Sequence, residues 1–409
     1  MTESILQTAC NKQAWLDFLD YKLDKQHLNR TEEKELRDFI ENEEYAALCD
    51  LWEKEQFPQS YPLKRIINKQ GSRKKRVIYT FPGAEGILLK FIAFHLYRYD
   101  YIFCENCYAF RQNFGVWEAI HRIRTTHNIG QKYCLKVDIS NYFNSIDVDV
   151  LLEKLAFIQE TDFNLYKLFV KILKEERVLE DTKILLDKHG AMAGTPTSPF
   201  FANVYLKDVD CYFKEMGILY FRYSDDILIF ADSLEELENY QHILYEQIKS
   251  LGLAINPDKV HISAPGETWE FLGFSYRNGE IDLSDTTLHK MKAKIKRKAD
   301  SLRRWSRSKN LPYEKAAIGL IHTMNRKFFG SATLEEEDDE DTKEFTWSRW
   351  FFPNLTTDKG LKIIDAYFQE YIRYTVTGRH YKGSYRISYE QLKDWGYRSL
   401  VHEYYKERR

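Results

Sequence analysis

Three aspartates in the middle of the chain close apolar segments, where acidic side chains are unusual. Asp225 and Asp226 lie at a very short link between the apolar runs Leu219–Tyr223 and Asp226–Ala231, a pattern that predicts a tight hairpin. Two carboxylates at such a tip repel each other and lose hydration, and a bound divalent cation would offset that cost. Mg²⁺ prefers hard oxygen ligands of this kind. A solvated turn is the alternative explanation for the pair by itself.

Asp138 supplies a third carboxylate in the same kind of setting. It closes the apolar strand predicted over residues 133–139, and a strand beside the hairpin would bring it to Asp225 and Asp226. Three carboxylates from neighbouring strand ends can hold two cations roughly 3.5–4 Å apart. Such a pair supports in-line phosphoryl displacement, in which one cation activates a 3′-hydroxyl and the other neutralises the leaving pyrophosphate. The three acids therefore predict two-metal phosphoryl-transfer chemistry.

The elements that must position these acids alternate between strand and helix. Helical periodicity and β-branched runs predict helices over 148–157, 164–175, 198–216 and 234–251, and a further strand over 269–276. This order is typical of an α+β layer, in which helices back an antiparallel sheet.

The flanking segments differ from this middle third. The first sixty residues have helical periodicity, and the basic stretch 69–76 precedes an apolar run, which together predict a hairpin with a basic tip. Beyond residue 284 the chain is predicted to be helical. The acidic run 335–341 is typical of an exposed linker, and a final unit rich in Tyr, Arg and Lys follows it.

Charge is distributed unevenly although the net charge of the 409 residues is only -2. Between Lys290 and Lys309 ten of twenty residues are Lys or Arg, and Asp300 is the only acid. Such segregation is typical of a protein with one electropositive working face. The near-neutral total excludes no class of partner.

The cysteines and the apolar runs indicate a reduced, cytoplasmic setting. Six cysteines are scattered along a sequence in which we find no signal peptide. Cys104 and Cys107 form one Cys-x-x-Cys, but no second pair stands at zinc spacing, so we expect no zinc site. No apolar run reaches the roughly twenty residues that span a membrane, so we expect no membrane association.

Six segments resemble the sequence motifs of reverse transcriptases. Tyr223–Asp226 is similar to their Tyr-x-Asp-Asp box, and residues 135–147 are similar to their first palm motif. The other matches keep the family's order and spacing: Phe110-Arg111 before the palm, 194–203 for the second palm motif, 251–259 for the fourth, and 271–274 for the primer grip. The resemblance implies a template-directed nucleic-acid polymerase.

The same resemblance implies a right-hand polymerase fold, with an antiparallel palm sheet backed by helices and a helical thumb. The expected organisation is an N-terminal helical region (1–60), fingers (61–137), palm (138–280), thumb (281–334), an acidic linker (335–344) and a helical, RNA-contacting C-terminal extension (345–409).

Catalytic roles follow from the matched positions. Asp138, Asp225 and Asp226 correspond to the family's ligands for two Mg²⁺ ions, with Mn²⁺ as an alternative, and the Ile139 carbonyl is expected to assist. Lys259 corresponds to the lysine that protonates pyrophosphate as a general acid.

Nucleotide binding is expected from two places. Phe143 corresponds to the aromatic residue that lies under the sugar and excludes a 2′-hydroxyl, which favours dNTPs; a core Phe is the alternative. Lys69 and Arg76 resemble the fingers pair that clamps the triphosphate, and Lys74 and Lys75 compete for the lysine's role.

Ala193 and Gly194 are expected to line the pocket for the incoming nucleotide. Relatives usually have Gln where this chain has Ala193, which leaves the nucleotide preference open. In the basic stretch, Lys292, Lys296 and Arg303 lie along one predicted helical face and are expected to contact phosphates; a solvated helix is the alternative.

The C-terminal unit is similar to the extension of bacterial defence-associated (unknown-group) reverse transcriptases, on residues 361–374, 385–388 and 396–401. Those enzymes act against phage, and several copy an adjacent structured noncoding RNA. The resemblance implies an RNA template, a cDNA product and dNTPs as partners. Interleaved Tyr and Arg suit contact with folded RNA, although an ordinary helical domain packed on the thumb explains them equally well.

Other readings stay open. A retron-like enzyme is disfavoured because the Asn-Ala-x-x-His box is missing between the first two palm motifs. An intron-derived enzyme, a template-independent nucleotide polymerase and an RNA-binding module with a vestigial palm are the remaining alternatives. The oligomeric state is open, and a homo-oligomer is among the options.

Overall fold

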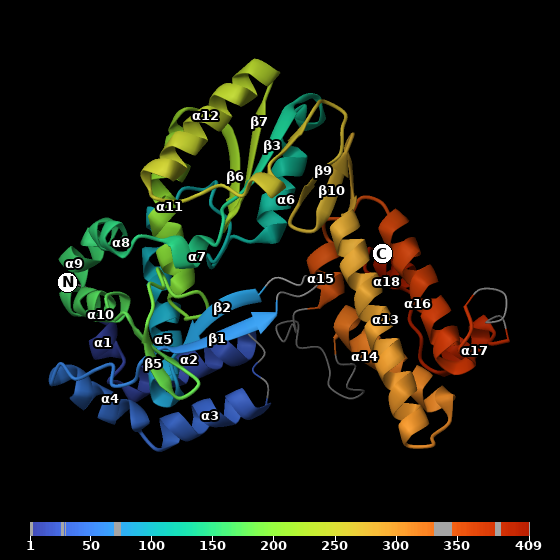
Figure 1. Cartoon of the computed structure of the whole chain (residues 1–409), viewed down its shortest axis with the longest axis horizontal. Coiled ribbons are helices and arrows are strands. Elements are labelled where there is room, and N and C mark those ends of the chain that lie inside the picture. The colour runs from blue at the N-terminus through green and yellow to red at the C-terminus, as the bar shows by residue number, and fades with distance from the viewer. Residues whose placement is uncertain are drawn as a thin grey trace. The chain divides into compact units, whose positions relative to one another are not determined.

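The apolar strands around the three aspartates form one sheet in the computed structural model, which describes residues 3–25, 28, 30–68, 75–330, 346–380 and 386–408 (Figure 1). The chain divides into two compact units, Met1–Pro265 and Gly266–Arg409. The sheet belongs to the first unit, has the order β6-β7-β3-β8, and is antiparallel throughout. Its strands are β3 (Tyr133–Asp138), β6 (Leu219–Tyr223), β7 (Asp226–Ala231) and β8 (His261–Ser263).

Helices cover this sheet, which confirms the predicted α+β architecture. Helix α11 (Ser198–Glu215) contacts β6, and α12 (Leu234–Ser250) contacts β3 and β7 (Figure 1). Because helices and loops cover the strands, side chains of both alternating sets are buried along β7. The Ser233 hydroxyl caps α12 by accepting a hydrogen bond from the Glu236 N–H.

The N-terminal helices pack around one aromatic core. They are α1 (Ile5–Thr8), α2 (Lys12–Lys25), α3 (Arg30–Glu41) and α4 (Glu44–Glu53), and they lie against α5 (Gly83–His95). The fully buried Trp15 stacks on Phe91 of α5 with ring centroids 4.2 Å apart. This confirms the helical periodicity expected for the first sixty residues.

A second four-stranded sheet has the order β2-β1-β4-β5. It consists of β1 (Leu63–Asn68), β2 (Lys75–Thr80), β4 (Arg177–Glu180) and β5 (Lys183–Leu186). Strands β1 and β2 pair antiparallel, which confirms the predicted hairpin. Its basic tip, with Lys69 and Lys74, lies outside the described residues.

The first unit is completed by short elements. They are η1 (Leu96–Ile102), α6 (Val116–Thr125), η2 (Ile129–Gln131), α7 (Tyr142–Ser145), α8 (Val148–Lys154), α9 (Ala156–Thr161), α10 (Phe163–Leu173) and η3 (Pro257–Lys259). The helix expected over 148–157 is wrong in one respect, because the chain breaks at Leu155 into α8 and α9.

The second unit begins with a three-stranded sheet of β9 (Trp269–Phe271), β10 (Phe274–Arg277) and β11 (Glu280–Leu283). The single strand expected over 269–276 is wrong, because Leu272 and Gly273 take positive φ values of 53° and 90° and form a tight turn. A Cβ on Gly273 would lie 2.9 Å from the Thr287 hydroxyl oxygen, so close packing also favours glycine here.

Among the described residues that follow β11, the regular elements are helices, as the sequence predicted. They are α13 (Asp285–Ser308), α14 (Tyr313–Phe329), α15 (Trp347–Phe351), α16 (Lys359–Thr377), α17 (Tyr389–Asp394) and α18 (Leu400–Lys406). Helices α13, α14 and α16 pack against one another. The acidic run 335–341 lies outside the described residues. In the part of the chain that the structure describes, no helix is both long and apolar enough to cross a membrane.

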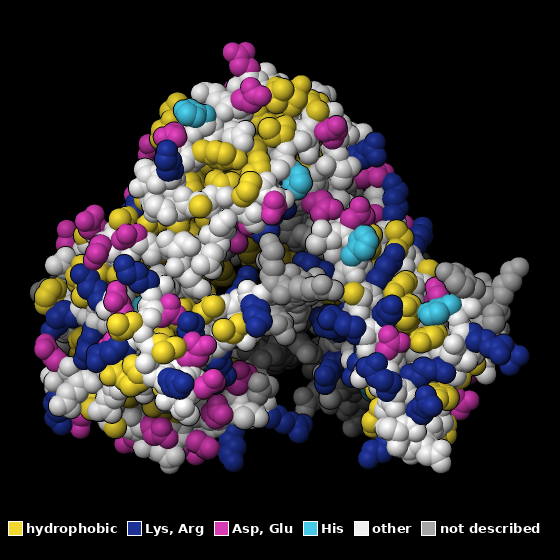
Figure 2. Space-filling model, viewed as in Figure 1, with side chains coloured by type: hydrophobic (Ala, Val, Ile, Leu, Met, Phe, Trp, Pro, Cys, Tyr) yellow, Lys and Arg dark blue, Asp and Glu magenta, His cyan; other side chains and the backbone are white. Residues whose placement is uncertain are grey.

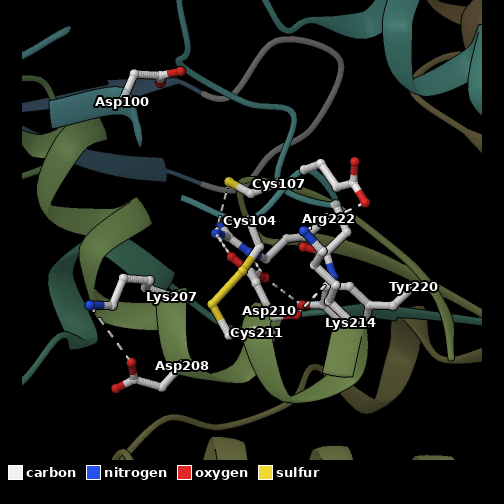
Figure 3. The surroundings of a disulfide bond; sticks show 12 residues. Asp100, Cys104, Cys107, Lys207, Asp208, Asp210, Cys211, Lys214, Tyr220 and Arg222 are labelled. Carbon is white, nitrogen blue, oxygen red and sulfur yellow. Dashed lines mark hydrogen bonds and ion pairs between the residues drawn. A yellow bond between two sulfur atoms is a disulfide. The ribbon is translucent and has the colours of Figure 1, made fainter. Parts of the chain in front are cut away.

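Four of the six cysteines form disulfides, which differs from the reduced thiols expected from the sequence. Cys10 pairs with Cys49, and Cys104 pairs with Cys211 of α11 (Figure 3). The Cys-x-x-Cys pair is therefore divided, because Cys107 remains a buried thiol whose pKa is raised to about 12 by burial. Sequence reasoning missed these pairs because their partners are 39 and 107 residues apart.

Candidate active site

Strand register brings the three aspartates together. Asp138 and Asp226 are direct partners across the antiparallel β3–β7 pair. Tyr223 and Asp226 are partners across β6–β7, so Ser224 and Asp225 form a two-residue link. The N–H of Ile139 donates to the Asp225 carbonyl at 3.1 Å, which ties the link to the end of β3.

Burial and like charges make this cluster electrostatically unfavourable. The pKa of Asp226 is raised to about 6, first by burial and further by Asp225 and Asp138, while Lys136 opposes the shift. The pKa of Asp225 is also raised, by burial and then by Asp138. Lys136 Nζ lies 3.7 Å from Asp226 Oδ1, which has no hydrogen-bond partner among the described residues.

A divalent cation suits this donor set. Among the described residues no three or more His, Cys, Asp or Glu side chains are already arranged as a metal cage. Three crowded carboxylates, two of them (Asp225 and Asp226) with raised pKa values and one with an unsatisfied buried oxygen, are nevertheless the hard, anionic ligands that Mg²⁺ prefers. The donor set therefore fits a divalent cation such as Mg²⁺, which Asp138, Asp225 and Asp226 would hold. The Ile139 carbonyl follows directly on Asp138.

Lys259 reaches the cluster from a separate segment. The Asn256 N–H donates to the Asp138 carbonyl at 2.8 Å, and the Asn256 side chain accepts from the Asp258 N–H at 3.2 Å. This docks η3 at the end of β3. Lys259 Nζ donates to Asp138 Oδ2, so the predicted general-acid lysine does lie at the aspartates.

Phe143 packs at the margin of the core and connects to the aspartate link through Phe110. It is half-buried in α7, and its ring meets that of Phe110 edge-on at 6.2 Å. Phe110 in turn lies 6.4 Å from the ring of Tyr223, which precedes the link. A half-exposed ring in this place can contact a sugar, whereas a fully buried core Phe could not.

The predicted nucleotide-binding residues come from β2 and the segment before α11. The Tyr79 N–H of β2 donates to the Ala193 carbonyl at 2.8 Å, and the Ala193 N–H donates to Asn144 Oδ1 at 3.0 Å. Gly194 has φ of 107°, and a Cβ there would lie 2.9 Å from the Tyr79 carbonyl oxygen. Arg76 on β2 is exposed, and its charge opposes the rise in the pKa of Asp225 that burial and Asp138 cause. Lys69 lies outside the described residues.

Lys and Arg side chains of the basic helix α13 lie against two neighbouring helices of the second unit, α14 and α16. Lys292 Nζ lies 5.6 Å from the Tyr367 ring of α16, and Lys296 is exposed. The pKa of Lys294 is lowered to about 8, by burial and then by Lys327 of α14 and Arg297. Figure 2 shows Lys and Arg side chains gathered over this part of the second unit. Crowded cations of this kind favour an anionic partner.

Arg303 differs from the phosphate contact expected of it. Its Nη1 donates to the carbonyls of Tyr374 and Thr375 at 2.8 and 3.1 Å, at the end of α16. Its guanidinium also lies 4.6 Å from the Tyr313 ring. The structure therefore shows Arg303 joining α13 to α16 and α14, a packing role that helical periodicity alone could not separate from phosphate binding.

Sequence reasoning also missed a buried ion pair behind the aspartate link. Arg222 of β6 and Asp210 of α11 are both 0% exposed, and Arg222 Nη2 lies 2.5 Å from Asp210 Oδ2 (Figure 3). The one available signal was an arginine in the otherwise apolar run Leu219–Tyr223.

Comparisons with known proteins agree with this geometry. A family model described as "Reverse transcriptase (RNA-dependent DNA polymerase)" matches residues 67–276, more than half of the chain. The retron Ec86 reverse transcriptase of Escherichia coli is 26% identical over 174 residues, 42% of this chain and 50% of that protein. The retron Ec83 reverse transcriptase of the same organism is 28% identical over 160 residues, 36% of this chain and 48% of that protein. The chain thus matches about half the length of these curated relatives.

Solved structures give a weaker likeness. A telomerase from Candida albicans, in complex with a TWJ fragment of telomeric RNA, has a TM-score of 0.42 at 13% identity and covers 87% of this chain and 68% of that one. An apo telomerase from Candida tropicalis has a TM-score of 0.38 at 13% identity and covers 55% of each chain. Likeness at this level carries no argument about the site.

Proposed function

Because the chain belongs to the reverse transcriptase family, whose model spans residues 67–276, we propose that it copies an RNA template into DNA from dNTPs. One observation carries the proposal: Asp138 and Asp226 are register partners at the ends of β3 and β7, with Asp225 beside them in a two-residue link. The family's motifs surround these acids in order.

In this proposal the three aspartates hold two Mg²⁺ ions. When bound, the cations favour deprotonation of a primer 3′-hydroxyl and neutralise charge on the leaving pyrophosphate. Asp138, Asp225 and Asp226 would hold these cations through their carboxylates, which by themselves repel a phosphate. Lys259, whose Nζ donates to Asp138 Oδ2, gives a proton to the pyrophosphate.

Residues around the aspartates select and hold the nucleotide. The half-buried ring of Phe143 lies against C2′ and excludes a 2′-hydroxyl, which favours dNTPs over NTPs. Arg76 of β2 binds the triphosphate, together with Lys69 or a neighbouring lysine. Ala193 and Gly194 line the pocket through backbone that is hydrogen-bonded to Tyr79 and α7.

The second unit contacts the template in this proposal. Lys292 and Lys296 of α13 meet phosphates, and the crowding of Lys294 with Lys327 and Arg297 supports an anionic partner. The resemblance of residues 361–401 to defence-associated enzymes supports a structured noncoding RNA as template and a role against phage. RNA and dNTPs meet in the cytoplasm, which is the compartment we propose.

A retron-like enzyme is the second candidate, because both curated relatives are retron reverse transcriptases. The missing Asn-Ala-x-x-His box argues against it. The two candidates differ in the RNA that is copied, so sequencing the nucleic acid that copurifies with the protein decides between them.

Primer extension tests the core of the proposal. We expect DNA synthesis on an RNA template with dNTPs and Mg²⁺, and background signal for Asp225→Ala, since the variant loses a cation ligand. Equal incorporation by the two proteins, or none by the wild type, would refute polymerisation. Phe143→Ala is expected to admit NTPs if the ring excludes the 2′-hydroxyl.

A biological assay separates enzyme from binding module. If the chain only binds RNA, Asp226→Asn will retain full protection against phage. If polymerisation is the function, that variant will lose protection while it still binds RNA.

A further inference from the structure

A fully buried arginine lies directly behind the aspartate link. Arg222 is 0% exposed and occupies the apolar strand β6. Burying a guanidinium is costly unless its charge is paired and its N–H groups are hydrogen-bonded. The groups that contact the guanidinium therefore indicate its role in the protein.

Each of the five guanidinium N–H groups has an acceptor. Nε donates to Asp210 Oδ1 at 2.7 Å and Nη2 to Asp210 Oδ2 at 2.5 Å, a bidentate pair (Figure 3). Nη2 also donates to the Cys107 Sγ at 3.0 Å. Nη1 donates to Asn203 Oδ1 and to the Ser224 carbonyl, both at 3.2 Å. The last of these acceptors belongs to the aspartate link itself.

The surroundings hold Arg222 in one orientation. Tyr220 donates its hydroxyl hydrogen to Asp210 Oδ1 at 3.0 Å, and Asn106 Nδ2 donates to the Asp210 carbonyl at 2.8 Å. The backbone of Arg222 pairs with the segment around Cys107, where its N–H donates to Asn106 and its carbonyl accepts from Tyr108, both at 2.9 Å. The guanidinium therefore has a fixed base from which Nη1 reaches Ser224.

Ser224 needs such support because its backbone is strained. It has φ of 61°, a left-handed conformation that costs a non-glycine residue about 1–2 kcal/mol. Its carbonyl belongs to the peptide group that leads into Asp225, and Arg222 binds that carbonyl. The Asp225 carbonyl accepts from the Ile139 N–H at 3.1 Å. Both peptide groups that flank the Asp225 side chain are thus held, one by Arg222 and one by β3.

We propose that Arg222 is a positioning residue: paired with Asp210, it fixes the Ser224 carbonyl and thereby the direction in which Asp225 presents its carboxylate. The inference rests on the proposed polymerase function and deepens it. Arg222 is buried behind the link and contacts no solvent, so its loss acts on turnover and cation binding and leaves nucleotide binding intact.

Removing one charge would leave the other buried and unpaired, so the test removes the group as a whole. The triple variant Asp210→Leu/Tyr220→Phe/Arg222→Met replaces the pair and its hydroxyl partner by apolar side chains of similar size, an exchange that buried ion pairs often tolerate. Arg222→Lys is the conservative companion, since it keeps a positive charge beside Asp210 but cannot also reach the Ser224 carbonyl. Tyr220→Phe alone is the matched control, because it removes a bond to Asp210 and leaves the Ser224 contact in place.

Four quantities are measured for each protein: the unfolding midpoint, kcat, KM for dNTP, and the dissociation constant of Mn²⁺ by electron paramagnetic resonance without nucleic acid. In the triple variant and in Arg222→Lys we expect kcat to fall about 10- to 100-fold, as for a small misplacement of a reacting group. We expect Mn²⁺ to bind several-fold more weakly and KM to stay unchanged. Tyr220→Phe is expected to keep wild-type kcat and Mn²⁺ binding.

Two outcomes would overturn the proposal: wild-type kcat and Mn²⁺ binding in folded Arg222→Lys, or an equal loss in Tyr220→Phe. If the triple variant fails to fold, Arg222→Lys decides alone. If the wild type incorporates no nucleotide, the polymerase proposal fails, and the Mn²⁺ measurement still decides whether Arg222 positions Asp225.

Discussion

Two charge clusters lie near the same end of the sheet formed by β6, β7, β3 and β8, and they are built in opposite ways. The aspartates at the ends of β3 and β7 crowd charges of one sign, and the pKa values of Asp225 and Asp226 are raised, first by burial and then by the neighbouring carboxylates. Arg222 and Asp210 have opposite charges, complete burial and an acceptor for each guanidinium hydrogen. The charges of the first cluster are compensated only in part, by Lys136 and Lys259, whereas every guanidinium hydrogen of the second has an acceptor.

The crowded aspartates have the features of a binding site, and the Arg222–Asp210 pair has those of the structural support behind it. A polymerase needs acids that stay destabilised until a cation arrives, since that gives the cation its affinity. It also needs backbone that does not move when the cation binds. The chain places the two requirements three residues apart in one hairpin, on Arg222 and Asp225, and Arg222 binds the carbonyl of the intervening Ser224.

The largest effect is expected from breaking the satisfied cluster. Asp210→Ala leaves the Arg222 guanidinium buried without a counter-ion, so we expect a loss of about 3–5 kcal/mol in the free energy of unfolding. Urea denaturation followed by circular dichroism measures it. A loss below about 1 kcal/mol would mean that the pair is less well buried than the structure indicates.

The opposite sign is expected for the crowded cluster. Asp226→Asn removes a carboxylate whose pKa is raised from 3.8 to about 6, so the cation-free protein should gain stability at neutral pH, by up to about 3 kcal/mol. Activity should fall to background, because a cation ligand is lost. Denaturation in the presence of EDTA tests the first statement and primer extension the second. A clear loss of stability would show that burial and mutual repulsion do not destabilise the aspartates in the folded chain.

A smaller change in stability is expected when Mg²⁺ is added, because only the aspartate cluster should bind the cation. We expect Mg²⁺ at ten times its dissociation constant to stabilise the wild type by about 1.4 kcal/mol, since it binds only the folded chain. The shift in unfolding midpoint with Mg²⁺ concentration measures this. Asp225→Ala should lose the shift and Tyr220→Phe should keep it; equal shifts in the two variants would place the cation elsewhere.

The smallest effect tests how much of the scaffold is redundant. Tyr220→Phe removes one hydrogen bond to Asp210 at 3.0 Å and should cost roughly 1 kcal/mol of unfolding free energy. Differential scanning calorimetry resolves a change of this size. A loss as large as that of Asp210→Ala would show that the hydroxyl holds the carboxylate in place.

Sequence patterns predicted the fold class and the meeting of the aspartates, because both depend on local features. An acid that closes an apolar strand lies where that strand leaves the sheet, and a two-residue link places its neighbours there too. The same local reasoning failed at 269–276, where Leu272 and Gly273 turn the chain, and at Arg303, whose charge binds α16 carbonyls. Hydrophobic periodicity and charge alone do not reveal a turn inside a predicted strand, nor a hydrogen-bond partner on another helix.

The sequence by itself thus determined where Asp138, Asp225 and Asp226 lie and the family to which their motifs belong. Only the tertiary structure decided that Arg222 meets Cys107, 115 residues away, and that Cys104 pairs with Cys211. The physical reason is that satisfying a buried charge requires acceptors from several elements at once. The order of residues along the chain determines which of them are neighbours on a strand. The packing of α11 against β6 determines which side chains are buried together.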